Sequence, residues 1–283
     1  MKRAASAFLL LLTLFSVPFS AFAESGMDTV ADASQMTRIE EVAEEGMTSV
    51  SAESLQDGEY PVAVKCSSSM FRIESALLRV QDGEMSAVLS MGSGSYPYVF
   101  PGTAQEAAAA SMSAYIPLSE EGSFTIPVEA LDAAQPCAAF SRNKQLWYDR
   151  ALLFRADSLP VSAFREGFFT TAESLGLADG RYTADVTLAG GSGRAGVQSP
   201  AVLNVEDGKC SAVIVWSSRN YDYMKVDGEK ILPAANEDNS AFEIPVLFFD
   251  RPMAVIADTV AMSEPHEIAY TLRFDSASLE AVN

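Results

Sequence analysis

The chain contains one histidine, three cysteines and two tryptophans among its 283 residues. A Ser-His-Asp triad can therefore use only His266, and the sequence has neither a Gly-x-Ser-x-Gly motif nor a phosphate-binding loop. Cys66, Cys137 and Cys210 do not have the spacing of zinc ligands. These shortages predict that the protein is not an enzyme.

Basic residues are also scarce, with 19 lysines and arginines against 38 aspartates and glutamates and a net charge of −19. Without Lys2 and Arg3, 17 basic residues remain and the net charge becomes −21. Such a charge argues against a nucleic-acid partner and against binding to an anionic membrane surface. It favours solubility, and it does not select a ligand.

A second long apolar run is missing after the first 23 residues. Residues 1–23 have the features of a secretory signal peptide: Lys2 and Arg3 at the start, a short apolar core over 8–15, and Ala21-Phe22-Ala23 as a small-x-small cleavage site. We therefore expect a protein that is secreted or associated with the extracellular surface, with no membrane span after signal cleavage. The acidic, Ser- and Thr-containing stretch 24–51 is expected to be a flexible spacer.

The rest of the chain repeats itself. Residues Ala52–Leu55 followed by Asp57-Gly58 recur as Ala172–Leu175 followed by Asp179-Gly180, and 124–128 recur as 242–246. Each repeat is long enough to form a whole domain rather than one turn of a solenoid. We expect a first unit over 52–158, a linker over 159–171 and a second unit over 172–283.

Both units show the alternation of half-buried strands and lack an amphipathic helix of three turns. One such apolar face is Met85, Ala87, Leu89 and Met91, and the matching face is Cys210, Ala212, Ile214 and Trp216. Asp82-Gly83 and Asp207-Gly208 fit hairpin turns between strands. The pattern predicts an all-β protein made of two tandem immunoglobulin-like β-sandwich domains.

The three cysteines fall at positions where the sister unit has an apolar residue. This favours buried thiols that act as small hydrophobic side chains. A disulfide between Cys66 and Cys137 is the alternative, and the odd number of cysteines leaves at least one thiol unpaired within the chain.

Two stretches are candidates for a binding surface. In the segment 220–224, Tyr221 and Tyr223 would lie on one face of an extended strand, either as an exposed edge or as a pair of core residues. In the last strand, His266 and Tyr270 share a face with apolar residues. His266 is then either a structural residue or the iron ligand of a pocket that Tyr270 supports.

The order of motifs resembles the NEAT (near-iron-transporter) domain, a haem-binding module of secreted and surface proteins in Gram-positive bacteria. The second unit carries the frame well and the first unit carries it more loosely. The motifs are Asp179-Gly180-x-Tyr182, Ala201-x-Leu203-x-Val205-x-Asp207-Gly208-Lys209, Ser217-Ser218, Lys225-Val226-Asp227-Gly228, Phe242-x-Ile244-x-Val246 and Tyr270-x-x-x-Phe274.

The resemblance implies haem as the cofactor and Tyr270 as the supporting residue. The family has a tyrosine as the iron ligand, and this sequence departs from it by having His266 at that position, where an imidazole can also bind haem iron. We also expect Tyr221 and Tyr223 to be secondary contacts or a protein-facing edge, with Met224 or Met262 as the candidate for a second axial ligand. The Ser-rich lip of the family is matched in the first unit by Ser68, Ser69 and Met70, whereas Gly191-Ser192-Gly193-Arg194 stands there in the second unit.

The expected function is that of a secreted haem- or iron-complex-binding protein for iron acquisition, which passes its cargo to a surface receptor or transporter. The alternative is a tandem immunoglobulin-like adhesion module that binds a protein or glycan without a cofactor. A haem titration separates the two hypotheses.

Overall fold

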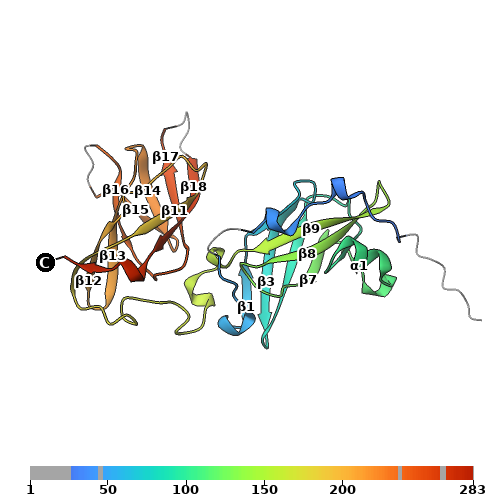
Figure 1. The fold of residues 1–283 in the computed structure, drawn as a ribbon, viewed down its shortest axis with the longest axis horizontal. Coiled ribbons are helices and arrows are strands. Elements are labelled where there is room, and N and C mark those ends of the chain that lie inside the picture. Colours follow the sequence, from blue (N-terminus) through green and yellow to red (C-terminus); the bar gives the residue numbers. More distant parts are fainter. Residues whose placement is uncertain (1–26, 44–46, 235–237, 262–265, 283) are drawn as a thin grey trace, which may run out of the picture.

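The computed structural model describes residues 27–43, 47–234, 238–261 and 266–282 (Figure 1). Within them the chain forms four antiparallel sheets, two in each half, which confirms the predicted all-β sandwich fold. Residues 1–23, which the sequence predicts to be a signal peptide, and Met262 lie outside the described residues.

The two sheets of the first half are built from nine strands. The order of one sheet is β1 (Gly58–Pro61), β3 (Ile73–Gln81), β4 (Glu84–Met91) and β7 (Ser123–Pro127). The order of the other is β2 (Val64–Cys66), β9 (Leu146–Phe154), β8 (Ala134–Ser141), β5 (Tyr98–Phe100) and β6 (Ile116–Pro117).

The second half repeats this strand order and adds one edge strand. One sheet runs β16 (Ala241–Pro245), β13 (Lys209–Val215), β12 (Ala201–Glu206), β10 (Gly180–Ala184) and β19 (Glu280–Ala281). The other runs β11 (Val186–Gly190), β18 (His266–Phe274), β17 (Met253–Thr259), β14 (Tyr221–Val226) and β15 (Glu229–Ile231). The sequence repeat is therefore also a repeat of topology.

Each half encloses a hydrophobic core between its two sheets. Fully buried residues from both sheets meet there: Leu78, Leu89, Leu152 and Phe154 in the first half, and Leu203, Ile214, Leu272 and Phe274 in the second. Burying one such side chain contributes about 1.5–3 kcal/mol. The alternation that predicts an inward face in β13 is confirmed, because Cys210, Ala212 and Ile214 are all buried.

The hairpin turns lie where the Asp-Gly pairs predict them. Asp82-Gly83 joins β3 to β4, and Asp207-Gly208 joins β12 to β13. Both residues of each pair have a positive φ, at 53° and 82° in the first turn and 50° and 74° in the second. This left-handed geometry matches the twist of the paired strands, and glycine adopts it without strain.

The segment 24–51 corrects an expectation, because its described residues pack against the first half instead of forming a solvated spacer. Val42 and Val50 are fully buried, and Val50 bridges Leu131. The Trp147 indole donates a hydrogen bond of 2.8 Å to the carbonyl of Met27. Scattered apolar residues in an acidic stretch are enough to fix it to the outer side of β8 and β9.

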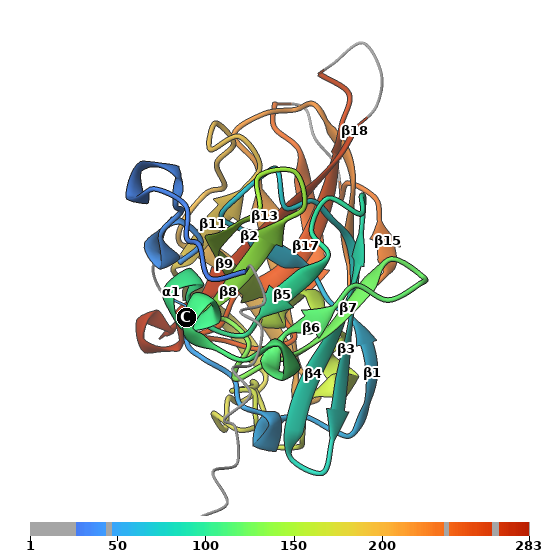
Figure 2. The ribbon, with the colours of Figure 1, turned by 90° about the vertical axis from the view of Figure 1, so that its right-hand side faces the viewer.

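The short helix α1 (Ala104–Ala109) lies against the same two strands (Figure 2). Thr103 caps it by accepting a hydrogen bond from the Glu106 amide, and the Glu106 carboxylate accepts one from the Thr103 amide. Ala104 and Ala107 face Tyr115 and Trp147 in a small separate cluster. The outer face of this sheet is therefore covered by helix and by the segment that precedes β1.

The predicted linker 159–171 is packed rather than extended away from the halves. Ala163 and Phe164 belong to the core of the first half. Phe169 stacks on Phe248 of the second half, with ring centroids 4.1 Å apart and planes at 15°. This connection therefore touches both halves.

All three thiols are free, so the alternative of a Cys66–Cys137 disulfide is not the arrangement in this structure. Cys137 and Cys210 are buried and Cys66 is half-buried. Burial raises the pKa of Cys137 to about 12 and that of Cys210 to about 11. The prediction of buried thiols is confirmed for these two residues.

Asp132, which follows β7, gives the first half a pH-dependent stability. It has a φ of 53°, and its carboxylate accepts a hydrogen bond of 2.9 Å from the Ala156 amide. Burial nevertheless raises its pKa from 3.8 to about 6. Between these values the folded chain holds a proton that the unfolded chain has released, so stability falls as the pH rises through this window.

We expect the free energy of unfolding of Asp132→Asn, measured by urea titration, to lack this pH-dependent part. From pH 4 to pH 6.5 the wild-type chain should lose about 1–2 kcal/mol relative to the variant. If the free energies of unfolding of the two proteins changed in parallel with pH, that result would contradict the raised pKa assigned to Asp132.

Candidate ligand site in the second half

Tyr270 lies at the centre of an aromatic cluster in the second half. Its side chain points inward from β18 and is 4% exposed. Its hydroxyl is 3.2 Å from that of Tyr221, and the Trp216 ring lies 4.1 Å from Tyr221 and 5.1 Å from Tyr270. Burial raises the pKa of Tyr221 above its usual range, and the contact with Tyr270 adds to this shift.

Two glycines lie against Tyr270, one beside its backbone and one on its ring. Gly190, the last residue of β11, pairs with Tyr270, and Gly191 follows with a φ of 58°. A Cβ atom on Gly191 would lie 2.6 Å from Cε1 of Tyr270, and one on Gly190 would lie 2.8 Å from the carbonyl oxygen of Ala269. The glycines are therefore required by close contact, and the 190–193 segment forms a lip directly on the tyrosine.

The predicted pairing of Tyr221 and Tyr223 on one face is wrong. The register of β14 against β17 shifts between these two residues, which is a bulge. Tyr221 consequently points into the core, whereas Tyr223 lies on the outer face and donates a hydrogen bond of 2.6 Å to Glu267. An edge made of both rings does not form.

Met224 is a core residue. It is fully buried, and its sulfur accepts a hydrogen bond of 3.4 Å from the Trp216 indole. An axial ligand role for Met224 would first require this contact to break.

His266 lies at the open end of the same sheet. It begins β18, pairs with Thr259 of β17 and is exposed. Its imidazole makes no hydrogen bond with any other residue that the structure describes. Four residues of strand place it about 13 Å along β18 from Tyr270, outside the aromatic cluster.

Ser68, Ser69 and Met70 are not brought to this site, because they belong to the first half between β2 and β3. Ser68 is buried, Ser69 is exposed and Met70 is 71% exposed. The strand position that matches Tyr270 in the first half is occupied by Arg150. The predicted set of site residues is therefore divided between two places.

A polar cluster on the outer face next to His266 is not predicted from the sequence. Glu267 accepts hydrogen bonds from Tyr223 and pairs with Lys225, and these contacts lower its pKa, the lysine most. Asp258 is 3% exposed and its Oδ2 has no partner. Burial, followed by a hydrogen bond with Asp222, raises its pKa. The period-two pattern predicts that Asp258 and Glu267 point outward, but it does not predict that the side chains of this cluster bury one another.

The part of the chain that the structure describes holds no group of three or more histidine, cysteine, aspartate or glutamate side chains arranged to bind a metal ion. No helix in the same residues has the length and apolar character needed to cross a membrane. No protein-family model matches the chain, and no curated protein matches it either.

Proposed function

We propose that this chain is an exported protein that binds haem or a related iron complex in its second half and passes it to a receptor or transporter at the cell surface. The observation that supports this best is the glycine lip lying directly on Tyr270. Trp216 and Tyr221 pack beside this tyrosine as a flat, apolar surface, and in this proposal a porphyrin meets them only after the lip lifts.

The fit of haem to these residues depends on two features. The imidazole of His266 is exposed and makes no hydrogen bond to another described residue, so it is available to iron. The ring and hydroxyl of Tyr270 are covered by Gly191, so the lip must lift for a ligand to reach the hydroxyl. In this proposal His266 ligates iron, Tyr270 supports it, and Tyr221 holds the Tyr270 hydroxyl in place.

The alternative of an adhesion module that uses both tyrosines of segment 220–224 receives less support. Tyr221 is 9% exposed and faces Trp216, so it cannot contact a protein or glycan partner together with Tyr223.

We expect haem added to the purified full-length chain to give a saturable, shifted Soret band with one haem per chain. His266→Ala should weaken binding at least tenfold, because the iron loses its protein ligand. Tyr270→Phe should shift the spectrum with a smaller loss of affinity. Tyr148→Phe, on β9 of the first half, is the matched control and should leave the titration unchanged.

The absence of a shifted Soret band would refute haem binding, and a band unchanged in His266→Ala would refute the ligand assignment. A band lost in Tyr148→Phe but kept in His266→Ala would move the site to the first half.

A further inference from the structure

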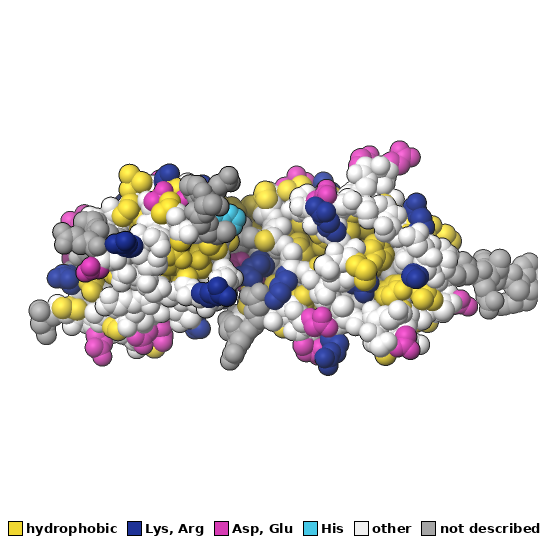
Figure 3. All heavy atoms as spheres, turned by 90° about the horizontal axis from the view of Figure 1, so that it is seen from above, with side chains coloured by type: hydrophobic (Ala, Val, Ile, Leu, Met, Phe, Trp, Pro, Cys, Tyr) yellow, Lys and Arg dark blue, Asp and Glu magenta, His cyan; other side chains and the backbone are white. Residues whose placement is uncertain are grey.

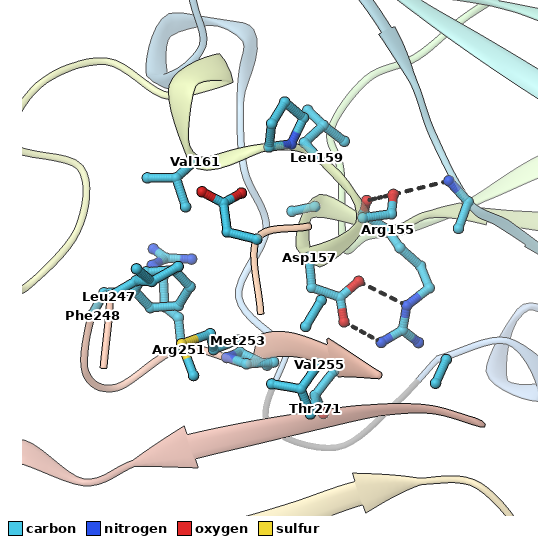
Figure 4. Close-up of a pocket in the computed structure, with 18 of the residues that line it drawn as sticks. Arg155, Asp157, Leu159, Val161, Leu247, Phe248, Arg251, Met253, Val255 and Thr271 are labelled. Carbon is cyan, nitrogen blue, oxygen red and sulfur yellow. Dashed lines mark hydrogen bonds and ion pairs between the residues drawn. The ribbon is translucent and has the colours of Figure 1, made fainter. Parts of the chain in front are cut away.

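A second site lies between the two halves, away from the Tyr270 ring. It is a cavity of about 860 Å³, within the range of roughly 300–1,000 Å³ that small-molecule sites occupy (Figure 4). One wall is the outer face of β17 and β18, and the other is the connection that runs from Arg155 to Phe169. The Tyr270 ring points away from it into the core, so the two sites use opposite faces of β18.

The walls of this cleft are mostly apolar. Its large apolar residues are Leu159, Phe164, Phe168, Leu247, Phe248 and Ile256. Phe168 stacks on Phe164 with centroids 4.7 Å apart, and Phe169 stacks on Phe248. The surface view shows hydrophobic side chains on both halves beside the hollow between them, with lysine and arginine side chains close by (Figure 3).

Three cations line the cleft, and one of them has no carboxylate partner among the described residues. Arg155 is held by Asp157 through bonds of 2.9 and 2.5 Å, and Lys225 is paired with Glu267 outside the cleft. Arg251 makes no ion pair with any described residue, and its guanidinium lies 4.3 Å from the centroid of the Phe168 ring. The positive charge of Arg251 acts to lower the pKa of Asp132, although the two side chains do not form an ion pair.

We propose that this cleft binds an amphipathic anion, a molecule with a flexible apolar chain and one carboxylate at its end. The carboxylate pairs with Arg251, whose planar guanidinium can donate two hydrogen bonds to it. The apolar chain lies against Phe168 and Phe248. Because the chain as a whole carries a charge of −19, an anion is held only where a local cation faces apolar surface, and Arg251 provides that place.

The test is isothermal titration calorimetry of the full-length chain with dodecanoate, at concentrations below micelle formation. Dodecyltrimethylammonium, with the same chain and the opposite charge, is the comparison probe. We expect saturable one-to-one binding of dodecanoate, and binding at least tenfold weaker for the cation. Arg251→Gln should weaken dodecanoate binding at least tenfold, whereas Arg181→Gln, an exposed arginine outside the cleft, should not change it.

A second variant, Ala254→Trp, fills the cleft from the exposed face of β17 and should abolish binding. Near-ultraviolet circular dichroism checks that both variants remain folded. Equal affinity for the two probes, or binding that survives both substitutions, would overturn the proposal. The haem titration monitors a different face of β18, so the failure of either proposal leaves the other distinguishable.

Discussion

Replacing Trp216 with alanine should lower the free energy of unfolding of the second half by about 3–5 kcal/mol. The indole is 1% exposed, and its ring contacts those of Tyr221 and Tyr270. Its loss leaves a cavity at the centre of the aromatic cluster and removes the hydrogen bond to Met224. Because the surrounding strands are hydrogen-bonded on both sides, they cannot collapse into the space.

This variant also tests whether the halves unfold separately. The chain has two tryptophans, so in Trp216→Ala the remaining fluorescence comes from Trp147 in the first half. We expect urea titration followed by far-ultraviolet circular dichroism to show an early transition, and the Trp147 fluorescence to keep its original midpoint. This follows from the two separate cores.

The mirror variant Trp147→Ala is the control and should move the transition of the first half instead. A fluorescence midpoint that falls together with the circular dichroism signal would mean that the contact of Phe169 with Phe248 couples the halves into one cooperative unit. A loss below about 1 kcal/mol would refute the burial of Trp216.

Replacing Arg150 with methionine should stabilise the first half by about 1–4 kcal/mol. The side chain is 3% exposed, and its Nε has no hydrogen-bond partner within the described part of the chain. One terminal nitrogen donates to the carbonyl of Asp149, and the guanidinium lies 5.0 Å from the centroid of the Tyr148 ring. These contacts do not offset the removal of a cation from water, whereas methionine fills the same space without that cost.

Urea unfolding followed by Trp147 fluorescence measures this change. Arg79→Met is the matched control, because Arg79 is exposed and its pair with Glu59 at 2.8 Å lies at the surface. That substitution should alter stability by no more than about 0.5 kcal/mol. A clear loss of stability in Arg150→Met would show that the buried guanidinium is compensated and that this explanation is wrong.

The alternation of side chains could be predicted because strand geometry is local. The buried face from Cys210 to Trp216 and the Asp207-Gly208 turn both follow from period two and from the φ that this turn requires. Tyr270 could be placed on an inward face for the same reason. The contact between Tyr270 and the lip could not be predicted, because it depends on where β11 ends in its pairing with β18.

The errors have equally specific causes. A single bulge between Tyr221 and Tyr223 places the two rings on opposite faces of the sheet, and no residue type in the segment predicts this bulge. Val42 and Val50 are isolated apolar residues in an acidic stretch, so their burial becomes visible only with their partners in β9 and at Leu131. The cleft around Arg251 is built from segments far apart in the chain, which a sequence pattern does not bring together.

The buried thiols have a consequence for how opening of the molecule can be followed in time. Cysteine reacts as the thiolate, and burial holds Cys137 and Cys210 in the protonated form at neutral pH. Each becomes reactive only when its own half opens, because Cys137 faces the core from β8 and Cys210 faces the core from the start of β13. The rate of alkylation at each position therefore reports the opening of one half alone, in the wild-type chain and without an engineered cysteine.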